Sequence, residues 1–347
     1  MLPAERISCK VREKHAISVW DEKLKSAQLG ERMERMEGEE ESGWRWGRTD
    51  FVIQDQIFNP ETNEFSFSMA PDPRRYIRVK EGPDKGYLDK YLRVLIPEDL
   101  MMKQLAEQMK NLSVYSLTPT IKSASGYAAS RNNAIRSELN TGTYIKPDEQ
   151  AAPHSPLVIG KNTKWLAFLS IDICNGSILR IANRTAFDTA YKIFLRELAT
   201  VVGQFNGTVL KTTGDGFIAY IDHPAFTQQG DNTIDLGLTF LVVLRDSINP
   251  ALKESGLPEL KIRVGADYGT VQLRTHEVPS TGFSSSEVGS DALNLAVKIE
   301  QSCEENEFRI GRALYEIIHV QWLERATEIN CESGNFGIPN YRIYRMR

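Results

Sequence analysis

The chain has 347 residues, of which 41% are hydrophobic and 25% charged, and its formal net charge is −4. These values are ordinary for a folded protein, so extended disorder is not expected, and the length accommodates two domains. The small negative charge excludes a global basic field for nucleic acid or for an anionic membrane surface. We therefore expect neither a nucleic-acid partner nor membrane association.

Cysteine usage and apolar runs bear on the cellular compartment. The four cysteines, at positions 9, 174, 303 and 331, form no CxxC pair, which is typical of reduced thiols in the cytoplasm. The first residues of the chain lack the apolar stretch of a signal peptide. The longest near-apolar run, Leu236–Leu244, is much shorter than the roughly 18–20 residues that span a bilayer. The sequence predicts a cytoplasmic protein.

Residues 1–140 are expected to form an α/β extension. Residues 13–41 are densely charged, as in a solvated or partner-facing helix. Strand-like stretches follow at 49–58 and 64–69, and residues 76–96 suggest further extended segments around a Gly-Pro-Asp turn. Helical spacing of apolar residues then predicts a helix over Glu98–Leu112. No chemical motif accompanies these elements, so the sequence does not indicate the role of this extension.

Residues 141–163, a polar stretch with three prolines, are the expected linker to a second domain at 164–347. In the first half of that domain the patterns predict a buried strand at 165–173, a helix at 185–205 and a hairpin of 208–212 with 217–221. A helix at 233–248 follows, and then a strand at 260–266 that resumes after a turn at Tyr268–Gly269. The domain is expected to end with a helix at 291–303 and a closing strand, short helix and hairpin. This order, β-α-β-β-α-β, predicts an α+β fold with a ferredoxin-like core and appended strands.

Two aspartates are the candidate chemical groups. Asp172 ends the predicted buried strand, and Asp215 lies in the turn of the predicted hairpin. Each alone has a structural explanation, because strand ends and Asp-Gly turns often contain aspartate. If the strands are neighbours, however, both carboxylates reach one sheet edge. Carboxylate oxygens are the ligands that Mg²⁺ prefers, and a pair of metal ions suits an in-line displacement. The five histidines show no spacing that would favour a transition metal.

Four segments, FLSIDICNGS, LKTTGDGFIAYI, KIRVGADYGTV and VGSDALNLAVKIE, occur in the order found in the class III adenylate and guanylate cyclases and resemble them. The resemblance covers roughly residues 164–347 and implies a cyclase catalytic core. It implies that Asp172, the carbonyl of Ile173 and Asp215 bind two divalent metal ions, Mg²⁺ or Mn²⁺.

The resemblance also implies roles in substrate binding and catalysis. Arg263 has the position of an arginine that holds the triphosphate, and Asn294 that of an asparagine that positions the ribose. Lys298 falls where the family usually has arginine, which keeps the charge but loses the planar guanidinium fork. Asn175 replaces a common glycine on the turn that faces the phosphates. The implied reaction is attack of the ribose 3′-oxygen on the α-phosphate with release of pyrophosphate.

The base of the nucleotide depends on other positions. Lys211 matches a lysine of the adenylate cyclases, and a second base-reading position is either Ser286 or Glu287, because the spacing to Asn294 is one residue longer than usual. No partner aspartate for adenine is evident. The GADYG turn and the compact design without receptor segments are similar to the pyrimidine cyclases of bacterial anti-phage Pycsar systems. In that case Tyr268 or part of the N-terminal region would narrow the base pocket.

The most specific reading is a pyrimidine cyclase that makes cyclic UMP or cyclic CMP as a signal for a separate effector. An adenylate cyclase is the alternative. Two further alternatives are a catalytically degenerate dimerisation or nucleotide-sensing module and an unrelated palm-type nucleotidyltransferase. In the family the site lies between two catalytic domains, so a single domain per chain implies a homodimer with two equivalent sites.

Overall fold

A computed structural model describes residues 11–12, 47–61, 64–79, 85–110, 119–158, 164–330, 336–338 and 341–347. The charged segment at 13–41 lies outside the described residues. The chain forms two compact units, Met1–Lys110 and Asn111–Arg347. Within the described ranges, no helix combines the length and the apolar character that crossing a membrane requires.

Among its described residues, the first unit has two antiparallel sheets and the helix α3. The strand order is β1-β3-β2 in one sheet and β4-β5-β6 in the other. The elements are β1 (Val11–Arg12), β2 (Phe51–Asn59), β3 (Glu64–Pro71), β4 (Tyr76–Val79), β5 (Gly86–Asp89), β6 (Val94–Pro97) and α3 (Glu98–Lys110). The predicted strands and helix of the extension are confirmed. A buried Arg75, paired with Asp50 at 3.0 Å and Asp89 at 2.7 Å, ties the segment before β2 to β5.

The second unit is built on one eight-stranded sheet. Seven strands follow the order β13-β14-β12-β10-β7-β9-β8, and in the part of the chain that the structure describes β11 pairs only with β10. The strands are β7 (Lys164–Ile173), β8 (Gly207–Thr212), β9 (Phe217–Ile221), β10 (Ile262–Val278), β11 (Phe283–Gly289), β12 (Glu307–Gly311), β13 (Ala326–Ile329) and β14 (Ile343–Met346). Each of the four strands β10-β7-β9-β8 runs antiparallel to its direct neighbour, as in a ferredoxin-like core. The predicted α+β fold with appended strands is confirmed.

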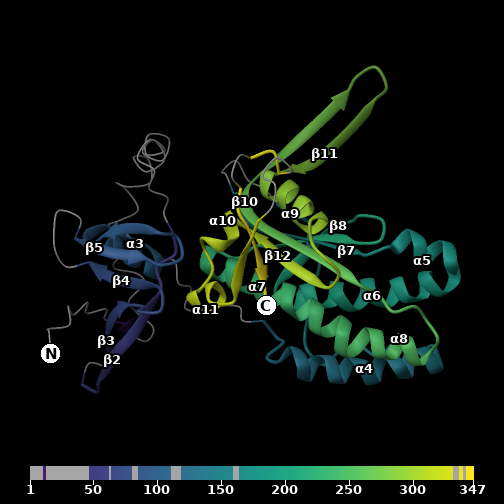
Figure 1. The fold of residues 1–347 in the computed structure, drawn as a ribbon, viewed down its shortest axis with the longest axis horizontal. Helices are drawn as coiled ribbons and strands as arrows, with labels where there is room; N and C mark the ends of the chain where they lie inside the picture. Colours follow the sequence, from purple (N-terminus) through teal and green to yellow (C-terminus); the bar gives the residue numbers. More distant parts are fainter. Residues whose placement is uncertain are drawn as a thin grey trace. The chain divides into compact units, whose positions relative to one another are not determined.

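The helices of this unit lie on both faces of the sheet (Figure 1). They are α4 (Ala124–Thr141), α5 (Gly176–Ala182), α6 (Arg184–Gln204), α7 (Phe226–Val243), the π-helical turn η2 (Leu244–Ile248), α8 (Asn249–Glu254), α9 (Asp291–Gln301), α10 (Arg312–Tyr315) and α11 (Val320–Leu323). The helix α7 begins at Phe226, earlier than the predicted start at 233. The polar residues of its first two turns hide the helical period in the sequence.

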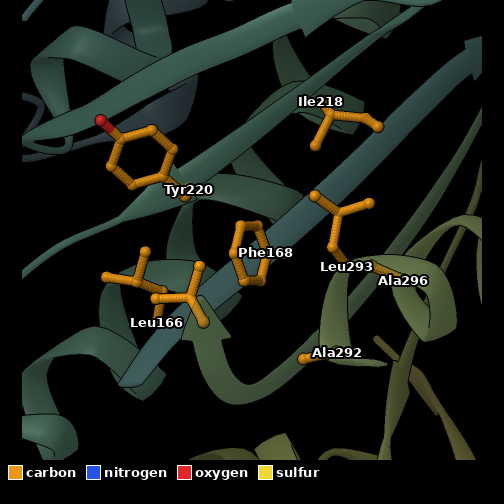
Figure 2. Packing of buried hydrophobic residues seen from close by; sticks show 8 residues of the cluster. Leu166, Phe168, Ile218, Tyr220, Ala292, Leu293 and Ala296 are labelled. Carbon is orange, nitrogen blue, oxygen red and sulfur yellow. The ribbon is translucent and has the colours of Figure 1, made fainter. Parts of the chain in front are cut away.

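One face of the sheet packs against α9. Phe168 and Leu166 of β7 contact Ile218 and Tyr220 of β9 and the small residues of α9, and all of these side chains are buried (Figure 2). A Cβ added at Gly265 of β10 would lie 2.3 Å from the carbonyl oxygen of Ala296. Glycine therefore allows α9 to lie directly on β10, which fixes the orientation of the exposed side of this helix.

The predicted turn at Tyr268–Gly269 is wrong. β10 runs without interruption for 17 residues, and Asp267, Tyr268 and Gly269 pair with Phe168, Ala167 and Leu166 of β7. A Cβ at Gly269 would come within 2.9 Å of the Ala292 side chain, so this glycine provides close packing instead of a turn. The chain reverses only after Val278, and β10 and β11 continue past the other strands as a largely exposed two-stranded arm (Figure 1).

The helix α4, which the sequence patterns did not reveal, belongs to the second unit. Ser123 caps its N-terminus by accepting a hydrogen bond from the Gly126 amide at 3.3 Å, and Gly142 ends it in a left-handed conformation with φ of 75°. The helix packs against α7, η2 and α8. The two units divide at residues 110–111, and the linker expected at 141–163 stays a prediction.

Residues 142–158, within that expected linker, have no helix or strand but are held along the second unit. The Ala152 amide donates to the Gly203 carbonyl at 2.8 Å, and His154 Nε2 lies 3.1 Å from the Val209 carbonyl oxygen. Leu157 packs against the core beneath α9. Backbone hydrogen bonds and one apolar side chain therefore fix the approach of this segment to β8.

A buried ion pair joins α4 to α6. The Arg131 guanidinium contacts both carboxylate oxygens of Glu197, at 2.8 and 3.0 Å, and the two side chains are 2% and 1% exposed. Glu197→Ala would leave Arg131 with an uncompensated buried charge, so we expect a loss of about 3 kcal/mol in the free energy of unfolding, measured by urea denaturation. Asp246→Asn, at the exposed Arg245–Asp246 pair, is the matched control and should cost less than about 1 kcal/mol. Equal effects of the two substitutions would contradict this assignment.

Candidate active site

Asp172 lies at the end of β7 and pairs with an arginine on the neighbouring strand. The register places Arg263 of β10 directly opposite, on the same face of the sheet, and its Nη2 lies 2.7 Å from Asp172 Oδ2. Arg263 Nε also lies 3.1 Å from Glu300 Oε1 at the end of α9, although the two atoms are not aligned for a hydrogen bond. The Arg263 guanidinium thus lies near two carboxyl groups, Asp172 of β7 and Glu300 of α9.

Asp215 is brought beside Asp172 by the β8–β9 hairpin. The turn is closed by a hydrogen bond from the Thr213 amide to the Gly216 carbonyl at 3.0 Å, and Gly214 has a φ of 88°. A Cβ at Gly216 would lie 2.0 Å from the Ile171 carbonyl oxygen, so the hairpin can approach β7 this closely only with glycine here. The predicted convergence of the two aspartates at one sheet edge is therefore seen in the structure.

The electrostatics of this edge are dominated by negative charge. Burial raises the pKa of Asp172; the hydrogen bond from Arg263 opposes this shift, and the nearby Asp215 carboxylate adds to it. Burial also raises the pKa of Glu300 to about 7, with a further contribution from Asp172. Asp172 and Glu300 therefore share Arg263, and Asp215 adds a further negative charge beside Asp172. An additional positive charge at this edge would be stabilised.

The turn after β7 fits closely around Asp215. Asn175 adopts a left-handed conformation with φ of 57°, which asparagine tolerates better than most residues, and it is exposed. A Cβ at Gly176 would lie 2.0 Å from Asp215 Oδ2. Asn175 is the residue that departs from the pattern of the cyclases. In the structure, the neighbouring Gly176 is the residue whose missing side chain makes room for the Asp215 carboxylate.

The donor set of this edge fits a magnesium-like cation. Asp172 and Asp215 offer carboxylate oxygens, and Mg²⁺ in proteins is commonly held by one or two carboxylates together with substrate phosphates. Ile173, the last residue of β7, is buried and its carbonyl lies next to Asp172 in the chain. Among the described residues there is no cluster of three or more His, Cys, Asp or Glu side chains that could hold a metal by itself.

Asn294 and Lys298 lie on α9, four residues apart on its exposed side. Lys298 Nζ donates a hydrogen bond to the carbonyl of Phe336 at 3.3 Å. Within the described part of the chain, neither side chain forms a hydrogen bond or an ion pair with Asp172 or Asp215. One protomer thus presents two separate groups of residues: a carboxylate pair at the sheet edge and a polar pair on α9.

Within the described ranges, no hydrogen bond or ion pair joins the proposed base-reading residues to the two aspartates. Lys211 is exposed on the edge strand β8. Ser286 and Glu287 are exposed on the arm, where the Ser286 hydroxyl lies 3.3 Å from that of Thr275. Tyr268 points to the face of the sheet opposite Arg263, because five residues separate them on a regular strand, and it stacks on Trp165 with ring centroids 5.4 Å apart. Tyr268 therefore does not face the carboxylates, and its narrowing of the base pocket stays a prediction.

A buried carboxyl group, Asp267, anchors the segment that faces Lys298. It accepts hydrogen bonds from the Tyr268 amide at 2.9 Å, the Leu314 amide at 3.3 Å and the Tyr341 hydroxyl. Tyr341 packs with Phe336, whose carbonyl receives the Lys298 hydrogen bond. The sequence did not single out Asp267 or Tyr341, because their contact joins residues 74 positions apart.

Asp267 should make the stability of the second unit depend on pH. Complete burial raises its pKa to about 7, against an ordinary value of about 4. A raised carboxyl pKa means that the folded state binds the proton more tightly, so its stabilisation is complete in acid and lost as the pH rises to about 7. We expect the wild-type melting temperature to fall between about pH 4 and pH 7 more steeply than that of Asp267→Asn, which keeps the acceptor oxygen but does not titrate. Parallel melting curves for the two proteins would contradict this role.

Comparison with known proteins adds a likeness in fold. No protein-family model and no curated protein matches the chain. Among solved structures, the guanylyl cyclase Cya2 and the adenylyl cyclase CyaB from P. aeruginosa are each 17% identical to it, with a TM-score of 0.45. The matches cover 54% of this chain and 94% and 95% of those chains. A bacterial light-regulated adenylyl cyclase is 16% identical, with a TM-score of 0.45, over 55% of this chain and 54% of its own.

Proposed function

We propose that residues 164–347 form a nucleotidyl cyclase, which converts a nucleoside triphosphate to a 3′,5′-cyclic nucleotide and pyrophosphate. The observation that best supports this proposal is that Asp172 and Asp215, from neighbouring strands, meet at a sheet edge where Asp172 is paired with Arg263. The reaction forms a bond from the ribose 3′-oxygen to the α-phosphorus, breaks the α–β phosphoanhydride bond and releases the 3′-hydroxyl proton.

The two aspartates, with the Ile173 carbonyl, would hold the divalent ions. When bound, Mg²⁺ or Mn²⁺ supplies Lewis-acid stabilisation of the phosphate oxygens and of the attacking hydroxyl. Arg263 would hold phosphate oxygens at the same edge, where its guanidinium already lies 2.7 Å from a carboxylate oxygen. Retention of both aspartates speaks against the degenerate-module alternative.

Asn294 and Lys298 would act on the carboxylate pair of a second subunit. Both are exposed and form no hydrogen bond or ion pair with their own subunit's aspartates within the described residues. In a two-fold symmetric dimer they would face the aspartates of the second subunit. Lys298 would place a point charge near the phosphates, and Asn294 would orient the ribose. The arm exposes Leu273, Val278 and Phe283, which are 52%, 42% and 56% accessible, and this apolar surface is available to a second copy of the chain.

For the base, the specific proposal stays a pyrimidine, UTP or CTP, with ATP as the alternative. Lys211, Ser286 and Glu287 are all exposed and would be accessible to a nucleotide that bridges two subunits. Tyr268 or part of the N-terminal region would narrow the base pocket. A cyclic pyrimidine nucleotide would act as an anti-phage alarm signal that a separate effector reads.

The experiment is incubation of the purified chain with ATP, GTP, CTP or UTP and Mn²⁺, followed by chromatography of the products. We expect a cyclic nucleotide and pyrophosphate, and loss of both with EDTA. Cyclic AMP as the sole product would replace the pyrimidine proposal by the alternative. A folded protein that yields no cyclic product from any of the four would refute the cyclase proposal.

A further inference from the structure

The helix α5 places a cationic side chain next to the carboxylate pair. Its first residue, Gly176, lies against Asp215, as the 2.0 Å approach of an added Cβ shows. Arg180 follows four residues later, so it lies one turn further along the same side of the helix. The helix also packs against α6, which supplies the aromatic side chains around Arg180.

The Arg180 guanidinium rests on an aromatic surface. Its Cζ lies 4.8 Å from the ring centroid of Phe187, which is completely buried. The Phe187 ring is nearly parallel to that of Tyr191, with centroids 6.2 Å apart. Burial raises the pKa of Tyr191, the Asp215 carboxylate adds to the shift, and Arg180 opposes it, so this phenol lies within electrostatic reach of both groups. Phe187 thus lies next to both Arg180 and Tyr191, and Gly176 of the same helix as Arg180 lies against Asp215.

Arg180 has no carboxylate partner among the described residues. By contrast, Arg263 at the same edge is paired with Asp172, and Arg196, further along α6, is paired with Glu138 at 2.5 Å. A half-buried guanidinium on an aromatic ring keeps its donors in a fixed plane without neutralising its charge. That combination suits recognition of a phosphate, which accepts two parallel hydrogen bonds from such a fork.

We propose that Arg180 binds the terminal phosphates of the substrate near Asp215, with Tyr191 as a hydroxyl donor beside it. This inference rests on the proposed function. A nucleoside triphosphate carries several negative charges, and Arg263 must divide its own charge between Asp172 and Glu300. Arg180 supplies the further positive charge at this edge. A purely structural role would need the aromatic contact with Phe187 but not the charged fork.

The test uses inorganic tripolyphosphate with Mg²⁺ and the full chain, with binding measured by calorimetry. We expect Arg180→Ala to weaken tripolyphosphate binding at least about ten-fold, and Arg180→Lys to recover only part of the loss. The matched control is Arg184→Ala at the start of α6, where the arginine is 83% exposed and 3.9 Å from Asp188; it should leave binding unchanged. A melting temperature near that of the wild type shows that each variant is folded.

Two results would overturn the inference: wild-type protein that does not bind tripolyphosphate, or folded Arg180→Ala protein that binds it as tightly as the wild type. Failure of the cyclase proposal gives a different pattern, namely Arg180-dependent tripolyphosphate binding without any cyclic product. If the cyclase is active, Arg180→Ala should raise KM for the nucleotide more than it lowers kcat. If the cyclase is active and its KM is unchanged by Arg180→Ala, the proposed role of Arg180 is refuted and the cyclase proposal stands.

Discussion

Asp215→Asn is expected to reduce cyclic-nucleotide formation by about a thousand-fold or more while leaving the protein at least as stable as the wild type. The amide cannot hold a divalent cation as the carboxylate does, and the loss of several kcal/mol of metal-mediated stabilisation corresponds to such a factor. Stability should not fall, because the Asp215 carboxylate raises the pKa of Asp172 and the substitution removes this repulsion. Product chromatography and thermal denaturation measure the two effects.

The control for this substitution lies at the other end of the same strand. Asp222 follows β9 and pairs with Lys164 at 2.5 Å on the surface, so Asp222→Asn should leave cyclase activity unchanged. Asp215→Asn protein with activity within about ten-fold of the wild type would show that this carboxylate does not hold the catalytic metal. A large loss of stability would instead assign it a structural role.

Mixing two inactive variants is expected to restore about a quarter of the wild-type activity. Asp215→Asn removes the metal side of the site and Asn294→Ala the ribose side, and the structure presents these as separate groups on one protomer. Random pairing makes half of the dimers mixed, and each mixed dimer has one intact site of two, which gives about a quarter of the full number of sites.

The control mixture combines Asp215→Asn with Asp172→Asn. Both substitutions remove the metal side, so every site in the mixed dimer lacks one carboxylate and no activity should return. Recovery in the first mixture alone supports a site shared by two subunits. If mixed dimers are isolated by two affinity tags and the first mixture stays inactive, Asn294 does not act across a subunit interface.

Most strands and helices of the second unit could be predicted from short windows of sequence. Local patterns predict the strand at 165–173, the helix at 185–205 and the hairpin around the Gly-Asp-Gly turn. The periodicity of a strand or helix depends only on residues that are close in sequence. The proximity of Asp172 and Asp215 also followed, once the strands were taken as neighbours. The turn expected at Tyr268–Gly269 was wrong because a glycine that permits close packing and a glycine that permits a turn look alike in sequence.

The sequence by itself determined the order of elements in the second unit and the two aspartates at the ends of neighbouring segments. Only the tertiary structure decided that Arg263 faces Asp172 and Glu300, that Tyr268 lies on the opposite face, that Gly176 makes room for Asp215, and that Arg180 stands unpaired among the described residues beside them. Local periodicity sets the conformation of each segment over a few residues. Which charges meet depends on strand register and helix packing between residues up to 91 positions apart, and these are fixed only when the whole sheet has formed.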